Sequence, residues 1–135
     1  MIDETKGVDR RKEPRYEILI EANVMTPGGS FTATAKNISG GGMEIQLPEP
    51  INPNTNLTIS LELHEEFVFQ GTVVWTLGDY INKGWIYRTG IKTDTIMFKD
   101  RTLVGDQEKR ELVQRILPRI RDLGADDALK NKEAA

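Results

Sequence analysis

The stretch that decides the fold is residues 31–47, with the sequence FTATAKNISGGGMEIQL. Apolar residues occupy every second position before its glycine turn and again after it: Phe31, Ala33, Ala35, Met43, Ile45 and Leu47. A period of two indicates two strands, each with one buried face. The turn between them, Asn37–Gly42, contains three consecutive glycines. Without side chains there, a flat or anionic ligand can approach the backbone N–H groups.

The same alternation predicts further strands on both sides of this stretch. They lie at residues 16–25, 57–64, 67–77 and 85–93, and a proline-rich loop lies at 48–54. Gly78 and Asp79 are expected to open a connection, and Trp75 and Trp85 are assigned to the core. Six or seven short strands at close spacing predict a mainly β protein, an antiparallel β-barrel whose closure leaves few open edges.

The period changes to that of a helix after residue 106. Apolar residues recur there at Leu112, Val113, Ile116, Leu117, Ile120 and Leu123. Asp106 is the expected N-cap and Gly124 the expected stop, while Pro118 predicts a kink or break near Leu117. We therefore expect a flexible tail at 1–9, the barrel with a ligand arm at 10–105, a C-terminal α-helix packed on the barrel or on a partner at 106–124, and a disordered tail at 125–135.

A cationic segment, Arg10-Arg11-Lys12-Glu13-Pro14-Arg15, precedes the first strand. Residues 6–15 have a net charge of +3, whereas the whole chain has −3. Such a local patch fits a small anionic ligand better than a long nucleic acid, although a tail that only confers solubility has the same composition. In an extended chain, Arg11 and Arg15 project from the same face, as the two sides of a clamp would.

Other classes of function find little support in the sequence. The length of 135 residues fits one domain, and the chain has no Cys and a single His, His64, so neither a disulfide framework nor a metal site is expected. No apolar run reaches the ~20 residues of a membrane span, and the N-terminus lacks a signal-peptide core. No nucleophile stands beside a base and no phosphate-binding loop motif occurs. We expect a cytoplasmic protein without enzymatic activity or membrane insertion.

Two short motifs carry a resemblance to a known family. Arg11-x-x-x-Arg15 followed by Asn37-x-Ser39-x-x-Gly42 resembles the paired RxxxR and (D/N)xSxxG signature of the PilZ domain, and the likeness runs from about Arg10 to about Ile91. That family is a six- or seven-stranded β-barrel that binds the bacterial second messenger cyclic di-GMP. The resemblance implies a cyclic di-GMP receptor that needs no cofactor.

The resemblance also implies a set of ligand-binding residues: Arg10, Arg11, Arg15, Asn37, Ser39, Gly41 and Gly42. In it, Arg11 and Arg15 are the main ligand arginines, Arg10 is linked to an intercalated dimer of the messenger, and Asn37 pairs with the guanine edge. Judged from chemistry alone, Ser39 fits a local cap of the turn as well as a phosphate donor, and Gly41 fits a positive backbone φ as well as ligand contact. We expect the cationic arm to be loose before binding and to close over the ligand, which signals to a downstream protein partner.

Two alternatives remain open at this stage. One is a scaffold or protein-interaction domain that has the barrel but binds no nucleotide. The other is a small barrel that binds single-stranded nucleic acid, which the negative charge and the expected inward aromatics disfavour, so no DNA or RNA partner is expected. The sequence leaves open whether the protein is a monomer or a homodimer, and whether it acts in motility, polysaccharide secretion, adhesion or transcription.

Overall fold

The computed structural model describes residues 15–99, 101–104 and 111–134. Across these residues the chain forms a run of β-strands followed by a helical segment. The strands are β1 (Arg15–Thr26), β2 (Gly29–Ser39), β3 (Gly42–Leu47), β4 (Asn56–Leu61), β5 (Phe67–Ile81), β6 (Gly84–Phe98) and β7 (Arg101–Val104). A π-helical turn, η1 (Leu112–Ile116), leads into the α-helix α3 (Leu117–Ala134).

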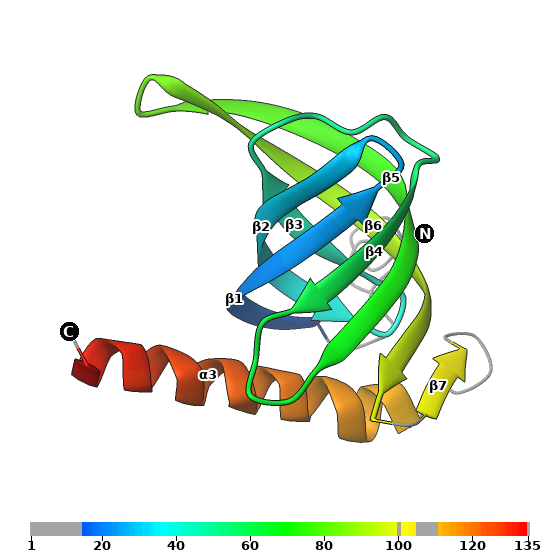
Figure 1. Cartoon of the computed structure of the whole chain (residues 1–135), viewed down its shortest axis with the longest axis vertical. Helices are drawn as coiled ribbons and strands as arrows, with labels where there is room; N and C mark the ends of the chain where they lie inside the picture. The colour runs from blue at the N-terminus through cyan, green and yellow to red at the C-terminus, as the bar shows by residue number, and fades with distance from the viewer. Residues whose placement is uncertain (1–14, 100, 105–110, 135) are drawn as a thin grey trace, which may run out of the picture.

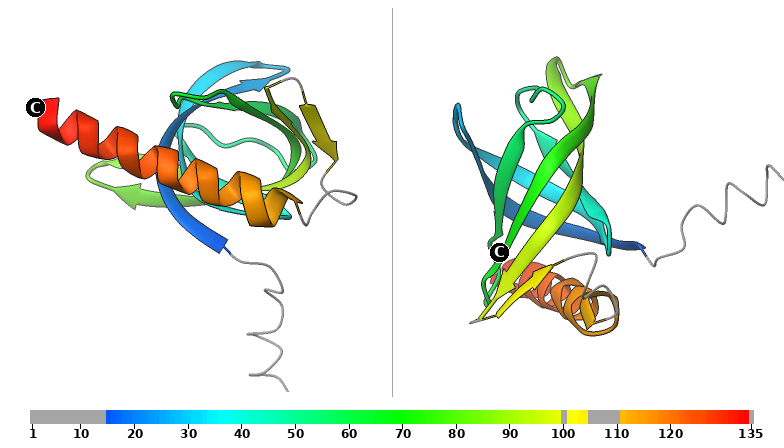
Figure 2. Two further views of the ribbon diagram at one scale, coloured as in Figure 1. Left: turned by 90° about the horizontal axis from the view of Figure 1, so that it is seen from below. Right: turned by 90° about the vertical axis from the view of Figure 1, so that its right-hand side faces the viewer.

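The strands close into an antiparallel barrel (Figures 1 and 2). Their order in the sheet is β3-β2-β1-β4-β5-β6-β7, and the additional pairing of β3 with β6 joins the two sides of the sheet. The closed ring therefore contains β1 to β6, and β7 is added along the end of β6. The predicted barrel of six or seven strands with a C-terminal helix is confirmed.

The barrel interior is filled by the apolar positions of the alternating strands. Ile20, Ala22 and Val24 of β1 are buried, as are the inward residues of β3 and β4. Phe67 and Phe69 of β5 are the largest fully buried side chains, and the Phe67 ring stacks on Phe98 with their centroids 4.6 Å apart. Apolar burial on this scale dominates the stability of a small domain.

The helix α3 lies across one open end of the barrel (Figures 1 and 2). Ile116, Leu117 and Ile120 are buried in the barrel core, and helical winding changes from π to α at Leu117, one residue before Pro118. A wide π turn is one of the identified causes of helix irregularity, and here it coincides with the kink predicted near Leu117.

The expected end of this helix at Gly124 is wrong, because α3 continues to Ala134 and includes residues expected to be disordered. A Cβ atom at Gly124 would lie 2.8 Å from the side chain of Ile20, so this glycine allows close packing of the helix on β1. One glycine costs a helix only about 1 kcal/mol, and the alanines and lysines that follow favour helix. The predicted N-cap, Asp106, and the tail at 1–9 lie outside the described residues.

The hairpin of β5 and β6 extends beyond the barrel wall (Figure 1). Gly78 and Asp79, expected to open a connection, lie within β5, and the turn falls at Asn82 and Lys83, which both have positive φ. Two consecutive residues with positive φ form the tight turn that matches the twist of a hairpin. Trp85, assigned to the core from the sequence, lies on this projecting part and is 55% exposed.

Candidate functional site

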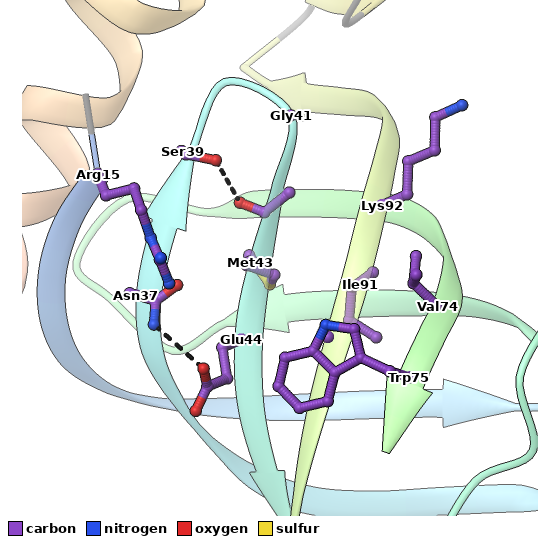
Figure 3. A pocket seen from close by; sticks show the side chains of 12 residues that line it. Arg15, Asn37, Ser39, Gly41, Met43, Glu44, Val74, Trp75, Ile91 and Lys92 are labelled. Carbon is purple, nitrogen blue, oxygen red and sulfur yellow. Dashed lines mark hydrogen bonds between the residues drawn. The ribbon is translucent and has the colours of Figure 1, made fainter. Parts of the chain in front are cut away.

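A pocket of about 310 Å³ opens beside the turn that joins β2 to β3 (Figure 3). Residues from β1, β2, β3, β5 and β6 line it, so it lies where strands distant in sequence meet. The lining residues are Arg15, Asn37, Ser39, Gly41, Gly42, Met43, Glu44, Val74, Trp75, Gly90, Ile91 and Lys92.

Antiparallel pairing brings three of the motif residues to this pocket. Arg15, at the start of β1, is the register partner of Ser39 at the end of β2, and its side chain runs toward Asn37 (Figure 3). Asn37 is in turn the register partner of Glu44 in β3. The Ser39 hydroxyl donates a hydrogen bond of 3.4 Å to the carbonyl oxygen of Gly42, which closes the turn.

Gly42 is required by the contact between β3 and β6. A Cβ atom at this position would lie 2.1 Å from the carbonyl oxygen of Ile91, far inside van der Waals contact. Only glycine therefore lets the edge of the pocket approach β6 this closely. The sequence reasoning assigned this glycine to ligand approach, whereas the structure shows a packing requirement of the barrel itself.

Glu44 places a carboxylate in the pocket and is held there by two donors. Asn37 donates from Nδ2 to Glu44 Oε1 at 3.4 Å, and Arg88 donates from Nε to Oε2 at 3.0 Å. The Glu44 side chain is only 12% exposed, whereas the Arg88 side chain is 41% exposed. The hydrogen bond with Glu44 raises the pKa of Arg88 above its ordinary value, so this guanidinium stays charged.

Trp75 lines the pocket because β5 contains a bulge. The register between β5 and β6 shifts between Val73 and Trp75, so that Val73 is buried while Val74 and Trp75 both face outward. The assignment of Trp75 to the core is thus wrong, since strict alternation would have placed it on the face of Val73. A Cβ at Gly90 would lie 2.2 Å from the indole Nε1, so the ring rests on bare backbone. The Arg88 guanidinium carbon lies 5.9 Å from the ring centroid.

The structure therefore brings Arg15, Asn37, Ser39, Gly41 and Gly42 together around one pocket. The other two predicted site residues, Arg10 and Arg11, lie outside the described residues. Glu44 was not predicted for the site. Its place on the polar face of its strand is the sequence feature that could have indicated it. Trp75 and Lys92 reach the pocket through a bulge and through long-range strand pairing.

The chemistry of the pocket is suited to a polar, planar and anionic ligand. Arg15 and Lys92 provide cations, the indole of Trp75 provides a flat surface, and Asn37 and Ser39 provide hydrogen-bonding groups. Within the described ranges, no group of three His, Cys, Asp or Glu side chains is placed to hold a metal ion. None of the helices in that part of the chain is both long and apolar enough to cross a membrane.

The fold is a closed antiparallel barrel, and Arg15 and the glycine turn both line one pocket on it. The chain belongs to the PilZ domain family, because the family model matches residues 9–107, well over half of its length. None of the curated proteins compared with the chain matches it in sequence.

Three solved structures illustrate the similarity of fold. The PilZ domain of YcgR from Escherichia coli, solved with c-di-GMP, has 14% identity and a TM-score of 0.61, with 93% of this chain and 99% of that chain covered. The inhibitor of motility MotI/DgrA of Bacillus subtilis has 15% identity and a TM-score of 0.56, and the MrkH–c-di-GMP complex of K. pneumonia has 16% and 0.55. The matches cover 82% and 93% of this chain, respectively, but only 51% and 56% of those two longer proteins.

Proposed function

We propose that the protein is a cyclic di-GMP receptor domain whose ligand binds in the pocket between Arg15 and the Asn37–Gly42 turn. The observation that carries this proposal is the convergence of Arg15, Asn37, Ser39 and Gly42, from three different strands, on one pocket. Family membership supports it, as do the structures of the YcgR PilZ domain and of MrkH, which were both solved with this nucleotide.

Each residue has a role that its chemistry allows. Arg15 offers a bidentate fork to a phosphate or to the O6/N7 edge of guanine, and Ser39 has a hydroxyl to donate if it leaves its bond to Gly42. The exposed part of the Trp75 indole is a stacking surface for a base. Lys92 adds a second cation across the pocket from Arg15 (Figure 3).

Signalling by this domain depends on the cationic segment that precedes β1. In our proposal, Arg10 and Arg11 fold over the bound dinucleotide together with Arg15, because its phosphates remove the repulsion among the three guanidinium groups. Charge-assisted hydrogen bonds of about 1.5–3 kcal/mol each offset the cost of ordering the segment. The closed segment then presents a changed surface to a downstream protein.

Calorimetric titration with cyclic di-GMP tests the proposal. The wild-type protein should bind, and Arg15→Ala should weaken binding by about 1.5–3 kcal/mol, roughly 10- to 150-fold. Arg119→Ala is the matched control, because Arg119 is paired with Glu65 and does not line the pocket. Equal binding heats for the wild type and Arg15→Ala would show that Arg15 does not hold the nucleotide and would contradict the proposal. The fitted stoichiometry also distinguishes one bound nucleotide from an intercalated dimer.

One observation favours a second candidate function, a protein-interaction domain that binds no nucleotide. The projecting β5–β6 hairpin exposes four large apolar side chains, those of Leu77, Tyr80, Ile81 and Trp85. Clusters of this kind often mark protein contacts. Sedimentation velocity with and without cyclic di-GMP separates the candidates, because a scaffold of this kind shows no effect of the nucleotide on shape or association.

A further inference from the structure

Asn37 lacks part of what the recognition of guanine demands. The Watson–Crick edge of guanine presents two adjacent donors, N1–H and N2–H₂, beside the O6 acceptor. A carboxamide has a single acceptor atom, its oxygen, beside a donor NH₂ group, so Asn37 cannot offer a separate acceptor atom to each of the two donors. Here its Nδ2 already donates to Glu44 Oε1. A guanine in the pocket therefore needs another acceptor for its two adjacent donors.

Glu44 has the acceptor capacity that Asn37 lacks. An ionised carboxylate offers about four lone-pair sites on its two oxygens. Asn37 occupies one site on Oε1 and Arg88 one site on Oε2. Counting the contacts within the described part of the chain, each oxygen keeps one further lone-pair site, and the two oxygens match the two neighbouring donors of guanine in number and spacing.

The position of Glu44 is fixed before a ligand arrives. Its side chain is 12% exposed and lies in the pocket within reach of Asn37 (Figure 3). The contact with Arg88 balances the buried negative charge, and the Arg88 guanidinium itself lies near the Trp75 ring. A carboxylate held in this way recognises a ligand with little further loss of side-chain entropy.

We propose that Glu44 reads the Watson–Crick edge of guanine and makes the pocket select guanine over adenine. This inference rests on the proposed function and names the residue that determines its specificity. Adenine presents an acceptor, N1, where guanine presents N1–H, so the carboxylate would face a lone pair instead of a donor. Arg88 is the positioning residue that holds the carboxylate in place.

The test compares the binding of cyclic di-GMP and cyclic di-AMP to purified variants of the 135-residue chain by calorimetry. Glu44→Gln should weaken cyclic di-GMP binding on the order of 10- to 100-fold, the range for one bidentate base contact. Binding of cyclic di-AMP should not weaken, so the preference for guanine shrinks by the same factor. Glu62→Gln, an exposed carboxylate outside the pocket, should leave both affinities unchanged.

A rescue variant separates recognition from folding. Asn37→Asp in the Glu44→Gln background returns a carboxylate to the same pocket and should restore most of the lost affinity for cyclic di-GMP. Thermal unfolding verifies that each variant is folded. A wild type that binds cyclic di-GMP and a Glu44→Gln variant that binds it equally well would overturn this inference alone, as would failure of the rescue. A wild type that binds neither nucleotide would overturn the proposed function as well.

Discussion

At the scale of single residues, Gly42 shows how the barrel and the pocket depend on the same atoms. Gly42→Ala places a methyl group 2.1 Å from the Ile91 carbonyl oxygen, and backbone on both strands must shift to accept it. We expect a loss of about 1–3 kcal/mol in the free energy of unfolding, the usual cost of overpacking. Urea denaturation measures this loss.

Gly84→Ala is the matched control for Gly42→Ala. The nearest atom to a Cβ at Gly84 is the Ile81 carbonyl oxygen at 3.8 Å, which is ordinary contact. Its unfolding free energy should stay within about 0.5 kcal/mol of the wild type. If the two variants lost equal stability, a general cost of replacing strand glycines would explain the result and the close approach of β3 to β6 would not.

Trp75 and Trp85 lead to opposite expectations although both lie on the β5–β6 hairpin. Trp75 lines the pocket, so Trp75→Ala should weaken cyclic di-GMP binding by about 1–3 kcal/mol, the value of one stacked base. Trp85 does not line it, and Trp85→Ala should leave the affinity unchanged. Titrations of both variants decide the matter, and a larger effect at Trp85 would place the ligand on the projecting end of the hairpin instead of in the pocket.

Sequence reasoning reached some of these residues and missed others for physical reasons. Asn37, Ser39 and Gly42 could be predicted to lie together because one short turn fixes their positions relative to one another. Trp75 was misplaced because a single bulge reverses the face of every later residue in simple alternation, and no local signal marked that bulge. The position of Lys92 beside the pocket results from the pairing of β3 with β6, and this pairing could not be predicted because two other strands separate β3 and β6 in the chain.

At the scale of elements, α3 both covers one end of the barrel and adds buried side chains to its core. Ile120 is fully buried there, whereas Asp122, two residues later, is exposed. Ile120→Ala should lower the free energy of unfolding by about 2–5 kcal/mol, and Asp122→Ala should change it by less than about 0.5 kcal/mol. Chemical denaturation of both variants tests this. A neutral Ile120→Ala would mean that the barrel is stable without the helix contact.

The element boundaries were the least predictable part of the fold. The alternation located β1 to β6, whereas no strand was predicted at β7 (Arg101–Val104). The strands β5 and β6 each extend beyond the barrel, and Gly78, which was predicted to open a connection, lies within β5. Gly124 was likewise misinterpreted as the end of the helix. In the structure it lies inside α3, where the missing side chain allows close packing on Ile20. A Cβ atom at Gly78 would lie 3.0 Å from the Tyr87 ring and 3.2 Å from the Trp85 ring, so at both glycines a contact that the local sequence does not encode favours glycine.

At the scale of the whole molecule, charge determines how binding responds to salt. The chain has a net charge of −3, so attraction of an anionic dinucleotide depends on local cations such as Arg15 and Lys92. Raising the ionic strength from 0.1 to 1 M shortens the Debye length from about 10 to 3 Å. We expect the affinity to fall by roughly 3- to 10-fold, because exposed ion pairs contribute about 1 kcal/mol or less each. Titrations across this range measure the slope, and an affinity independent of salt would contradict phosphate pairing.

The central claim is that cyclic di-GMP lies between the cationic segment and the glycine turn of the barrel. Amide hydrogen exchange of the wild-type protein, measured with and without saturating cyclic di-GMP, tests it most directly. The account predicts slower exchange at residues 10–15 and 39–44, with residues 79–86 at the tip of the hairpin unaffected. Binding that slows exchange at the hairpin or in α3 while leaving residues 39–44 unchanged would contradict it.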